Sequence, residues 1–468
     1  MRDRPSGPLS RLAESIVRSK EMDGHASKRR LALVGLAVIS IFGFASCDWS
    51  QFRLTVTHTG DNETETAIST SNVSNLTLRF TATAGSFIGR SSPAVVKGVV
   101  YIGGVGNLYA FDAAGNTNCS GVPKTCAPLW TASVDASLIQ SSPAVVNGVL
   151  YIGGGGGNLY AFDAAGNTNC SGVPKTCTPL WTASTGTSIA SSPAVVNGVV
   201  YIGSLNGLYA FDAGGTSNCS GTPKTCAPLW TALSANDIES SPSVANGFVY
   251  VGANDGKTYA FDAGGTTNCS ATPKVCGPLW TYNTGNVSSS PAVINGVLYV
   301  GDLSSSVYAF DALGQTNCSG TPKVCQPLWS AGVDSNLGIV SSPAVAYGTV
   351  YAGDECSVFG HAYSCGNTPH LYALNATTGA VRWTAIESSG FVRSSPGIAN
   401  GVVFVGSGDG ILYAFDAAGS IDCSGTPTFC SPLWTGNTGG AVESSPAIAN
   451  GMVYVGSDDG KLYAYGLP

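Results

Sequence analysis

The sequence predicts an all-β fold, an eight-bladed β-propeller of four-stranded antiparallel blades, from two observations. Eight copies of Ser-Ser-Pro recur every 49 to 53 residues, ending at Pro93, Pro143, Pro193, Pro242, Pro291, Pro343, Pro396 and Pro446. Each interval holds too few strands to bury their own apolar faces, which is typical of stacked blades. The 61 glycines and only 10% charged residues among 468 suit short buried strands joined by tight turns.

Residues 191–231 represent one repeat and contain four expected strands: 193–196, 199–203, 208–212 and 228–232. Asn197-Gly198 joins the first two strands, because a type I′ hairpin turn needs positive φ at both central positions. Valine, isoleucine, tyrosine and phenylalanine fill the second and third strands, as β-structure favours. A long hairpin should connect the third strand to the fourth, which is centred on Trp230.

The ends of the chain are expected to close the ring. A tryptophan holds the fourth-strand position in seven repeats, and Phe80 holds it near the start of the chain. The last repeat stops after three strands at Tyr465, so residues 76–83 should complete its blade and remove an open sheet edge. The predicted organisation is an export signal and lipobox region at 1–47, a lead-in at 48–75 and the propeller at 76–468.

An export signal is expected at the N-terminus. The uncharged run 31–46 follows three basic residues and is shorter than the ~20 residues that span a bilayer. Initiation at Met22 would give a signal of ordinary length. Residues 44–47, Phe-Ala-Ser-Cys, resemble a bacterial lipobox with Cys47 as the lipidated residue, although Phe44 replaces the usual Leu. Lipoprotein, secreted protein and retained membrane anchor all stay open.

Fourteen of the 15 cysteines form seven local pairs, which predicts disulfides. Zinc is the competing interpretation, but two thiolates per repeat without a nearby histidine fall short of four ligands. Disulfides imply a location outside the cytoplasm. The pairs are Cys119/Cys126, Cys170/Cys177, Cys219/Cys226, Cys269/Cys276, Cys318/Cys325, Cys356/Cys365 and Cys423/Cys430.

The charge balance argues against nucleic acid as a partner. The first thirty residues hold 8 of the 21 basic and 4 of the 28 acidic residues, which leaves 13 basic against 24 acidic residues in the remainder. A chain this acidic lacks the basic surface that phosphate backbones require.

The repeat pattern of Ser-Ser-Pro, Asn-Gly, Tyr-Ala-Phe-Asp-Ala and Leu-Trp resembles the PQQ-like β-propeller repeat over residues 49–465. Residues 373–383 of the sixth repeat are similar to that family's tryptophan-docking motif, with Asn375 in place of Asp. Residues 48–53, Asp-Trp-Ser-Gln-Phe-Arg, look like the opening of such propellers. The cysteine hairpins of the other repeats depart from the family pattern.

The resemblance implies three kinds of function, because the family includes quinoprotein dehydrogenases, BamB-type envelope lipoproteins and sensor or adhesion-like modules. A dehydrogenase of this kind would be expected to carry an adjacent cysteine pair and a distinct set of calcium-binding acids, and the sequence shows neither. Four histidines also leave little for acid–base catalysis. We therefore expect no catalytic residues, no cofactor and no metal, with a PQQ-dependent dehydrogenase as the alternative.

Candidate binding residues lie where the chain enters each innermost strand, at the mouth of the central funnel. Arg90, Glu443 and Arg393 should be neighbours there, either as a binding site or as a solvated ion-pair cluster. The irregular sixth repeat should add His361 and His370 to the same rim, as a capped loop or, with Asp354 or Glu355, as a metal site. The binding candidates are Arg90, Gln140, Glu239, Arg393, Glu443, His361 and His370.

Three recurring features have plain structural interpretations. An aspartate ends most third strands, and one acid per repeat should hydrogen-bond the following turn rather than catalyse. Asn-Cys-Ser, formally a glycosylation acceptor, is interpreted as turn chemistry. One lysine per hairpin should form a partial basic ring on the opposite rim, or merely make each tip soluble: Lys124, Lys175, Lys224, Lys274 and Lys323.

Together these features predict a non-catalytic binding or scaffold propeller, located outside the cytoplasm as an envelope lipoprotein or a secreted protein. The expected partner is an envelope protein or a polysaccharide, bound at the funnel rim. Contact with a membrane is expected only through a lipid anchor or the signal segment, and the protein is expected to be monomeric.

Overall fold

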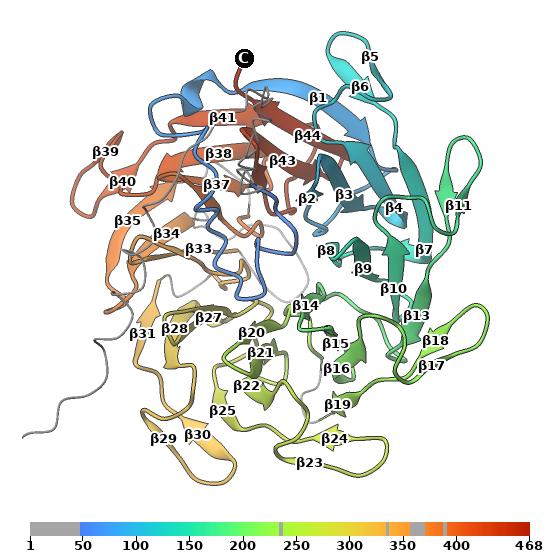
Figure 1. The fold of residues 1–468 in the computed structure, drawn as a ribbon. Helices are drawn as coiled ribbons and strands as arrows, with labels where there is room; N and C mark the ends of the chain where they lie inside the picture. Colours follow the sequence, from blue (N-terminus) through green and yellow to red (C-terminus); the bar gives the residue numbers. More distant parts are fainter. Residues whose placement is uncertain (1–46, 234–236, 334–336, 356–369, 387–390) are drawn as a thin grey trace, which may run out of the picture. The chain divides into compact units, whose positions relative to one another are not determined.

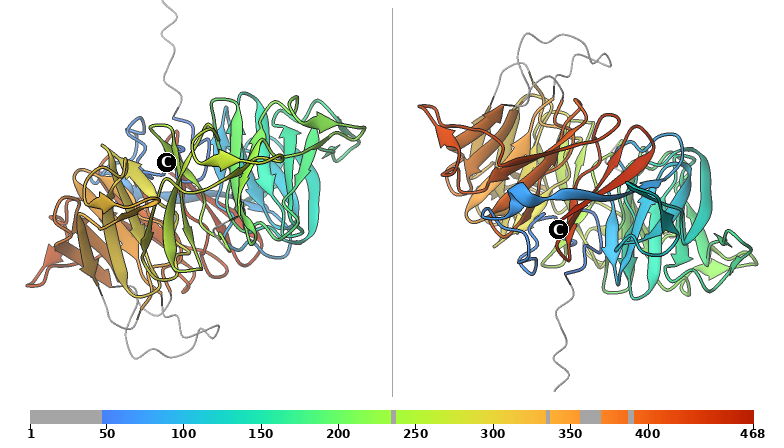
Figure 2. Two further views of the ribbon diagram at one scale, coloured as in Figure 1. Left: turned by 90° about the horizontal axis from the view of Figure 1, so that it is seen from below. Right: turned by 90° about the horizontal axis from the view of Figure 1, so that it is seen from above.

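The repeats fold into β-sheets that surround a central axis (Figure 1). The computed structural model describes residues 47–233, 237–333, 337–355, 370–386 and 391–468. Seen edge-on, the ring is short along its axis (Figure 2). Within the described residues, no helix is long and apolar enough to cross a membrane.

The innermost strand of each repeat follows Ser-Ser-Pro and ends at a tight turn. Asn197 and Gly198 have φ of 52° and 78°, the left-handed values that a type I′ turn requires. The innermost strands are β2 (Ala94–Val96), β8 (Ala144–Val146), β14 (Ala194–Val196), β20 (Ser243–Ala245), β26 (Ala292–Ile294), β32 (Ala344–Ala346), β36 (Gly397–Ala399) and β42 (Ala447–Ala449).

The second and third strands of each repeat pair antiparallel and carry most of the buried aliphatic side chains. The second strands are β3 (Val99–Gly103), β9 (Val149–Gly153), β15 (Val199–Ser204), β21 (Phe248–Ala253), β27 (Val297–Gly301), β33 (Thr349–Gly353), β37 (Val402–Gly406) and β43 (Met452–Ser457). The third strands are β4 (Val105–Asp112), β10 (Asn158–Asp163), β16 (Gly207–Asp212), β22 (Lys257–Asp262), β28 (Ser306–Asp311), β34 (His370–Asn375), β38 (Ile411–Asp416) and β44 (Lys461–Gly466).

The fourth, outer strands mostly begin at a tryptophan, since the proline two residues earlier has no N–H for a sheet. They are β7 (Trp130–Leu138), β13 (Trp181–Ser184), β19 (Trp230–Ala232), β25 (Trp280–Asn283), β31 (Trp329–Gly332), β35 (Val381–Ile386) and β41 (Trp434–Asn437). The last repeat takes its outer strand from the start of the chain: β1 (Thr77–Thr83) pairs antiparallel with β44, with Phe80 opposite Ala464. A single 3₁₀ turn, η1 (Val73–Asn75), precedes β1.

Each cysteine hairpin adds two short strands to the sheet of the preceding repeat. Thr176 and Cys177 pair in parallel with Thr131 and Ala132, for example, so the hairpins straddle repeat boundaries at the circumference (Figure 1). The hairpin strands are β5 (Cys119–Ser120) and β6 (Lys124–Cys126), β11 (Cys170–Ser171) and β12 (Thr176–Cys177), β17 (Cys219–Ser220) and β18 (Thr225–Cys226), β23 (Cys269–Ser270) and β24 (Val275–Cys276), β29 (Cys318–Ser319) and β30 (Lys323–Cys325), and β39 (Cys423–Ser424) and β40 (Phe429–Cys430).

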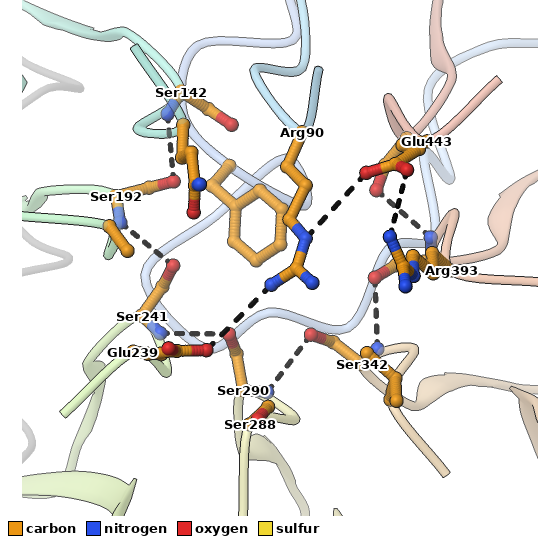
Figure 3. A pocket seen from close by; sticks show the side chains of 16 residues that line it. Arg90, Ser142, Ser192, Glu239, Ser241, Ser288, Ser290, Ser342, Arg393 and Glu443 are labelled. Carbon is orange, nitrogen blue, oxygen red and sulfur yellow. Dashed lines mark hydrogen bonds and ion pairs between the residues drawn. The ribbon is translucent and has the colours of Figure 1, made fainter. Parts of the chain in front are cut away.

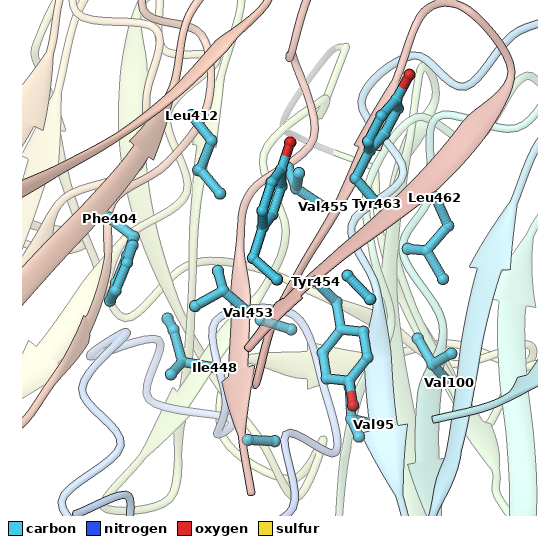
Figure 4. Packing of buried hydrophobic residues seen from close by; sticks show 14 of the residues in the cluster. Val95, Val100, Phe404, Leu412, Ile448, Val453, Tyr454, Val455, Leu462 and Tyr463 are labelled. Carbon is cyan, nitrogen blue, oxygen red and sulfur yellow. The ribbon is translucent and has the colours of Figure 1, made fainter. Parts of the chain in front are cut away.

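The prediction of an all-β propeller with four-stranded blades is confirmed, but the predicted count of eight blades is wrong. In the described part of the chain, six of the eight hydrogen-bonded sheets carry two short hairpin strands beyond the four strands of the blade. The buried side chains there gather into seven clusters rather than eight. One continuous cluster joins the first, seventh and last repeats around Val100, Phe404 and Tyr454 (Figure 4). Counted by packed cores, the propeller has seven units.

The lead-in segment, residues 48–75, runs through the central channel and contacts every innermost strand in turn. Backbone N–H groups of Val145, Val244 and Val345 donate to the carbonyls of Ser50, Val56 and Thr59 at 2.7–2.8 Å. On the last repeat, the Asn62 amide donates to the Ile448 carbonyl at 2.8 Å. The segment thus satisfies strand edges that would otherwise face the empty axis.

Candidate functional site

A closed belt of hydrogen bonds positions the funnel. The backbone N–H of the second serine in each Ser-Ser-Pro donates to the hydroxyl of the second serine in the next repeat, at 2.8–3.0 Å. Ser445 closes the belt by donating to Ser92 at 2.9 Å. Figure 3 shows the part of the belt that runs through Ser142, Ser192, Ser241, Ser290 and Ser342. The first serines bind the end of the second strand, as Ser191 does with Gly203. These serines are therefore structural.

The funnel is lined as the repeat predicted. The residue before each Ser-Ser-Pro lies at its wall, and Phe52 of the lead-in segment lines it from within the channel. Its volume is about 70 Å³. The eight wall residues are Arg90, Gln140, Ala190, Glu239, Ser288, Val340, Arg393 and Glu443.

Two arginines and three carboxylates form a network across the funnel mouth. Arg393 pairs with Glu443 at 2.9 Å and also with Glu355. Arg90 reaches Glu239 and Glu443, each at 3.7 Å, and Figure 3 shows it between them. Sequence reasoning placed Arg90, Arg393 and Glu443 together, and the structure does so. It missed that Glu239 faces Arg90 across the funnel, and that Glu355 joins from the sixth repeat.

The two arginines are held differently. The Arg393 side chain is 23% exposed, has short ion pairs and stacks on Phe391 with its Cζ atom 4.6 Å from the ring centroid. The Arg90 side chain is 37% exposed and its two ion pairs are long. Exposed, loosely held ion pairs exchange cheaply with other partners. Arg90 is thus the cation of this network most accessible to a ligand.

Asp458 is a charged group of this rim that the sequence did not single out. Burial first, and then the charge of Glu443, raise the pKa of its carboxyl to about 7 against the opposing effect of Arg393. Its Oδ1 atom has no hydrogen-bond partner among the described residues. Asp458-Asp459-Gly460 reads as an ordinary hairpin turn, so no local signal marks it.

The predicted sixth-repeat site is described only in part. His361, Cys356 and Cys365 lie outside the described residues. The His370 backbone N–H donates to Asp354 at 2.6 Å, and the His370 ring packs against Tyr372. Among the described residues, no group of three or more histidine, cysteine or acidic side chains is arranged to hold a metal ion.

Other recurring residues take structural places. Asp212 accepts backbone N–H groups from Gly214, Thr216 and Ser217, as predicted for a turn residue. Although partial burial opposes it, these hydrogen bonds lower the pKa of Asp212 to about 2. The predicted ring of lysines on the rim opposite the funnel is wrong, because the hairpins that carry these lysines lie around the circumference of the propeller (Figure 1).

Six predicted disulfides are present and Cys47 is a free thiol. The Cys47 thiol donates to the Thr64 carbonyl at 3.1 Å. The next residue, Asp48, accepts the backbone N–H of Lys97 in the turn after β2. Cys47 therefore lies beside the turns that end the innermost strands, on the rim opposite the funnel.

The funnel does not fit the quinone that the family resemblance implies. Pockets for ligands of that size measure roughly 300–1,000 Å³, against about 70 Å³ for the funnel. The channel below is filled by the lead-in segment, where Arg53 and His58 are buried. Burial and the Arg53 charge lower the pKa of His58 to about 3, so it is neutral. No cysteines are adjacent in the sequence.

Comparisons with known proteins agree with this architecture. A family model described as outer membrane protein assembly factor BamB matches residues 56–215, 89–317 and 326–422. No curated protein sequence matches the chain.

Solved structures share the fold at low identity. BamB from Moraxella catarrhalis is 15% identical with a TM-score of 0.56, covering 84% of this chain and 99% of its own. Quinohemoprotein alcohol dehydrogenase from Comamonas testosteroni is 15% identical with a TM-score of 0.65, covering 90% and 80%. The computationally designed Ika8 protein is 12% identical with a TM-score of 0.59, covering 83% and 99%.

Proposed function

We propose that this chain, which belongs to the family described as outer membrane protein assembly factor BamB, is a non-catalytic propeller that binds a protein of the cell envelope at its funnel rim. The observation that carries this proposal is Arg90. It is a part-exposed arginine at the mouth of a channel that the chain itself has filled.

The chemistry of the rim suits a partner carboxylate. Arg90 is shared between Glu239 and Glu443 at 3.7 Å, too long for strong hydrogen bonds. A carboxylate of the partner can pair with the exposed guanidinium in the bidentate geometry that arginine favours. Gln140 and Ser288, on the same wall, offer neutral hydrogen-bonding groups beside it.

The disulfides and the position of Cys47 support a location outside the cytoplasm. Six disulfides persist only in an oxidising compartment, which supports a site outside the cytoplasm. An acyl anchor on Cys47 would hold the opposite rim toward the membrane. The funnel would then face away from the membrane, open to a partner.

Photo-cross-linking in the producing cells tests the proposal. A benzoylphenylalanine probe at Gln140 or Ser288 should give a discrete protein adduct, and the same probe at Glu63, exposed on the opposite rim, should not. Arg90→Ala should reduce the Gln140 adduct several-fold. Arg79→Ala, which removes an exposed arginine of β1, is the matched control and should leave it unchanged. Adducts that form only at Glu63, or that survive Arg90→Ala, would refute the assignment.

A further inference from the structure

In the described part of the chain, two of the outer strands lack the hairpin strand that pairs with each of the others. The sheets ending in β31 and β41 have four strands, whereas each other outer strand pairs with a hairpin strand of the following repeat. The sixth repeat has a short Thr-Thr-Gly turn in place of the stapled hairpin, and the last repeat ends after its third strand. Uncovered edges of this kind are templates for another strand.

The six covered edges show what an occupant must supply. At four of these edges the residue after the tryptophan donates its backbone N–H to a hairpin carbonyl at 3.0 Å, as Thr131 does to Lys175 and Thr182 to Lys224. The second cysteine of each hairpin is 1–5% exposed and packs in the core between repeats: Cys126, Cys177, Cys226, Cys276, Cys325 and Cys430. An occupant thus runs parallel, offers a carbonyl, and buries a small apolar side chain two residues later.

At the β31 edge, the corresponding backbone N–H and tryptophan ring are not covered by a hairpin. Ser330 occupies the place of Thr131 and Thr182 and is exposed, and its N–H donates to no described backbone carbonyl outside the strand ladder of its own sheet. Trp329 is half-buried, while the tryptophans under hairpins are 1–3% exposed. Beside it lies a hollow of about 330 Å³, lined also by Leu328 and Tyr347, which are 42% and 60% exposed.

The β41 edge differs because the lead-in segment already packs there. The Trp434 indole donates to the Leu76 carbonyl at 3.0 Å, and Trp434 packs against the cluster that contains Val73. The apolar hollow and the free strand edge therefore coincide only at β31 among the described outer strands.

We propose that the β31 edge binds an extended segment of a partner protein, added in parallel as a fifth strand, with a small apolar side chain against Trp329. Strand addition of this kind draws affinity from backbone hydrogen bonds and specificity from side-chain pockets. In the described part of the chain, all six hairpins already pair within their own ring, which argues against a hairpin of a second copy as the occupant. This site lies on the circumference and is independent of the funnel.

A synthetic hairpin tests the site with a defined probe. The probe is the disulfide-closed, fluorescein-labelled peptide of residues 117–128, Thr-Asn-Cys-Ser-Gly-Val-Pro-Lys-Thr-Cys-Ala-Pro. Its binding to the purified protein is followed by fluorescence anisotropy. Ser330→Pro should weaken binding about tenfold, the effect of one lost backbone hydrogen bond. Ser330→Ala keeps the N–H and should leave the affinity within about twofold.

Hydrogen exchange on the wild-type protein provides an independent readout. The probe should slow exchange at the Ser330 amide and leave Arg90 and Gln140 unchanged. Equal affinity for the proline and alanine variants, protection elsewhere, or no binding of the probe would overturn the proposal. Self-association in sedimentation that Ser330→Pro abolishes would also overturn it, because the occupant would then be a second copy.

Discussion

Individual side chains of the funnel rim make the stability of this protein depend on pH. Asp458 has a pKa of about 7, above the ordinary value near 4 for an aspartate. The contribution of protonated Asp458 to the free energy of unfolding is therefore fully present below about pH 4, and it is lost as the pH rises through 7.

Asp458→Asn should accordingly stabilise the protein in alkaline solution only. The neutral amide escapes the cost of a charged carboxylate beside Glu443, so we expect a melting temperature about 1–3 °C higher at pH 8.5 and unchanged at pH 4. Asp459→Asn is the control, since Asp459 accepts hydrogen bonds from Lys461 and Tyr463 and should show no such gain. Calorimetry measures the melting temperature of each variant at pH 4 and pH 8.5. An equal shift of the melting temperature at both pH values would contradict the raised pKa of Asp458.

Gly60 reports on how tightly the lead-in segment fills the channel. It has φ of 68°, and an added Cβ would overlap the Arg53 guanidinium and lie 3.0 Å from the Pro396 carbonyl. Gly98 has φ of 76° with nothing within 4 Å. Both alanine variants carry the backbone strain, but Gly60→Ala should cost about 2 kcal/mol more. Equal unfolding free energies in urea would mean that the channel is loosely filled.

Among the strands and hairpins, the stapled hairpin has the clearest energetic role. Cys219→Ala/Cys226→Ala opens a loop of about eight residues, worth ~2.5 kcal/mol in the chain-entropy model, and removes a buried side chain. The unfolding free energy should fall by about 2–4 kcal/mol. Cys47→Ala, which removes the free thiol, should have no such effect. A double variant as stable as the wild type would show that the staple is not structural.

The local sequence pattern predicted the strands well, but it did not predict which strands of neighbouring repeats pair with one another. The Asn-Gly turns and the start of most outer strands at a tryptophan follow from backbone rules that act within a few residues. The pairing of Thr176 with Thr131 does not, because it joins neighbouring repeats through backbone groups that any sequence carries. The path of the lead-in segment escaped prediction for the same reason, since its partners lie up to 386 residues away.

The funnel could be predicted because position within a repeat determines position around the ring. That rule placed Arg90, Arg393 and Glu443 together from their shared place before Ser-Ser-Pro. Glu355 could not be found in this way, because it lies in an excursion without counterpart in the other repeats. That Arg90 and His370 bind a ligand or a partner stays a prediction.

Across the whole ring, closure depends on a strand from the far end of the chain. Phe80 in β1 is fully buried in the cluster shared by the first and last repeats. Phe80→Ala should cost about 3–5 kcal/mol, as for other large-to-small core changes. Phe429→Ala removes a 41% exposed ring from a hairpin and should cost less than about 1 kcal/mol. Similar losses for both, measured by denaturant unfolding, would contradict closure through β1.

We propose that this propeller binds rather than catalyses, because its own lead-in segment occupies the channel. The most direct test is to add pyrroloquinoline quinone and calcium to the purified protein, and to follow both the bound chromophore after desalting and dye-linked alcohol oxidation. We predict that no quinone is retained and that no alcohol is oxidised. Stoichiometric retention of the chromophore with turnover would contradict the account.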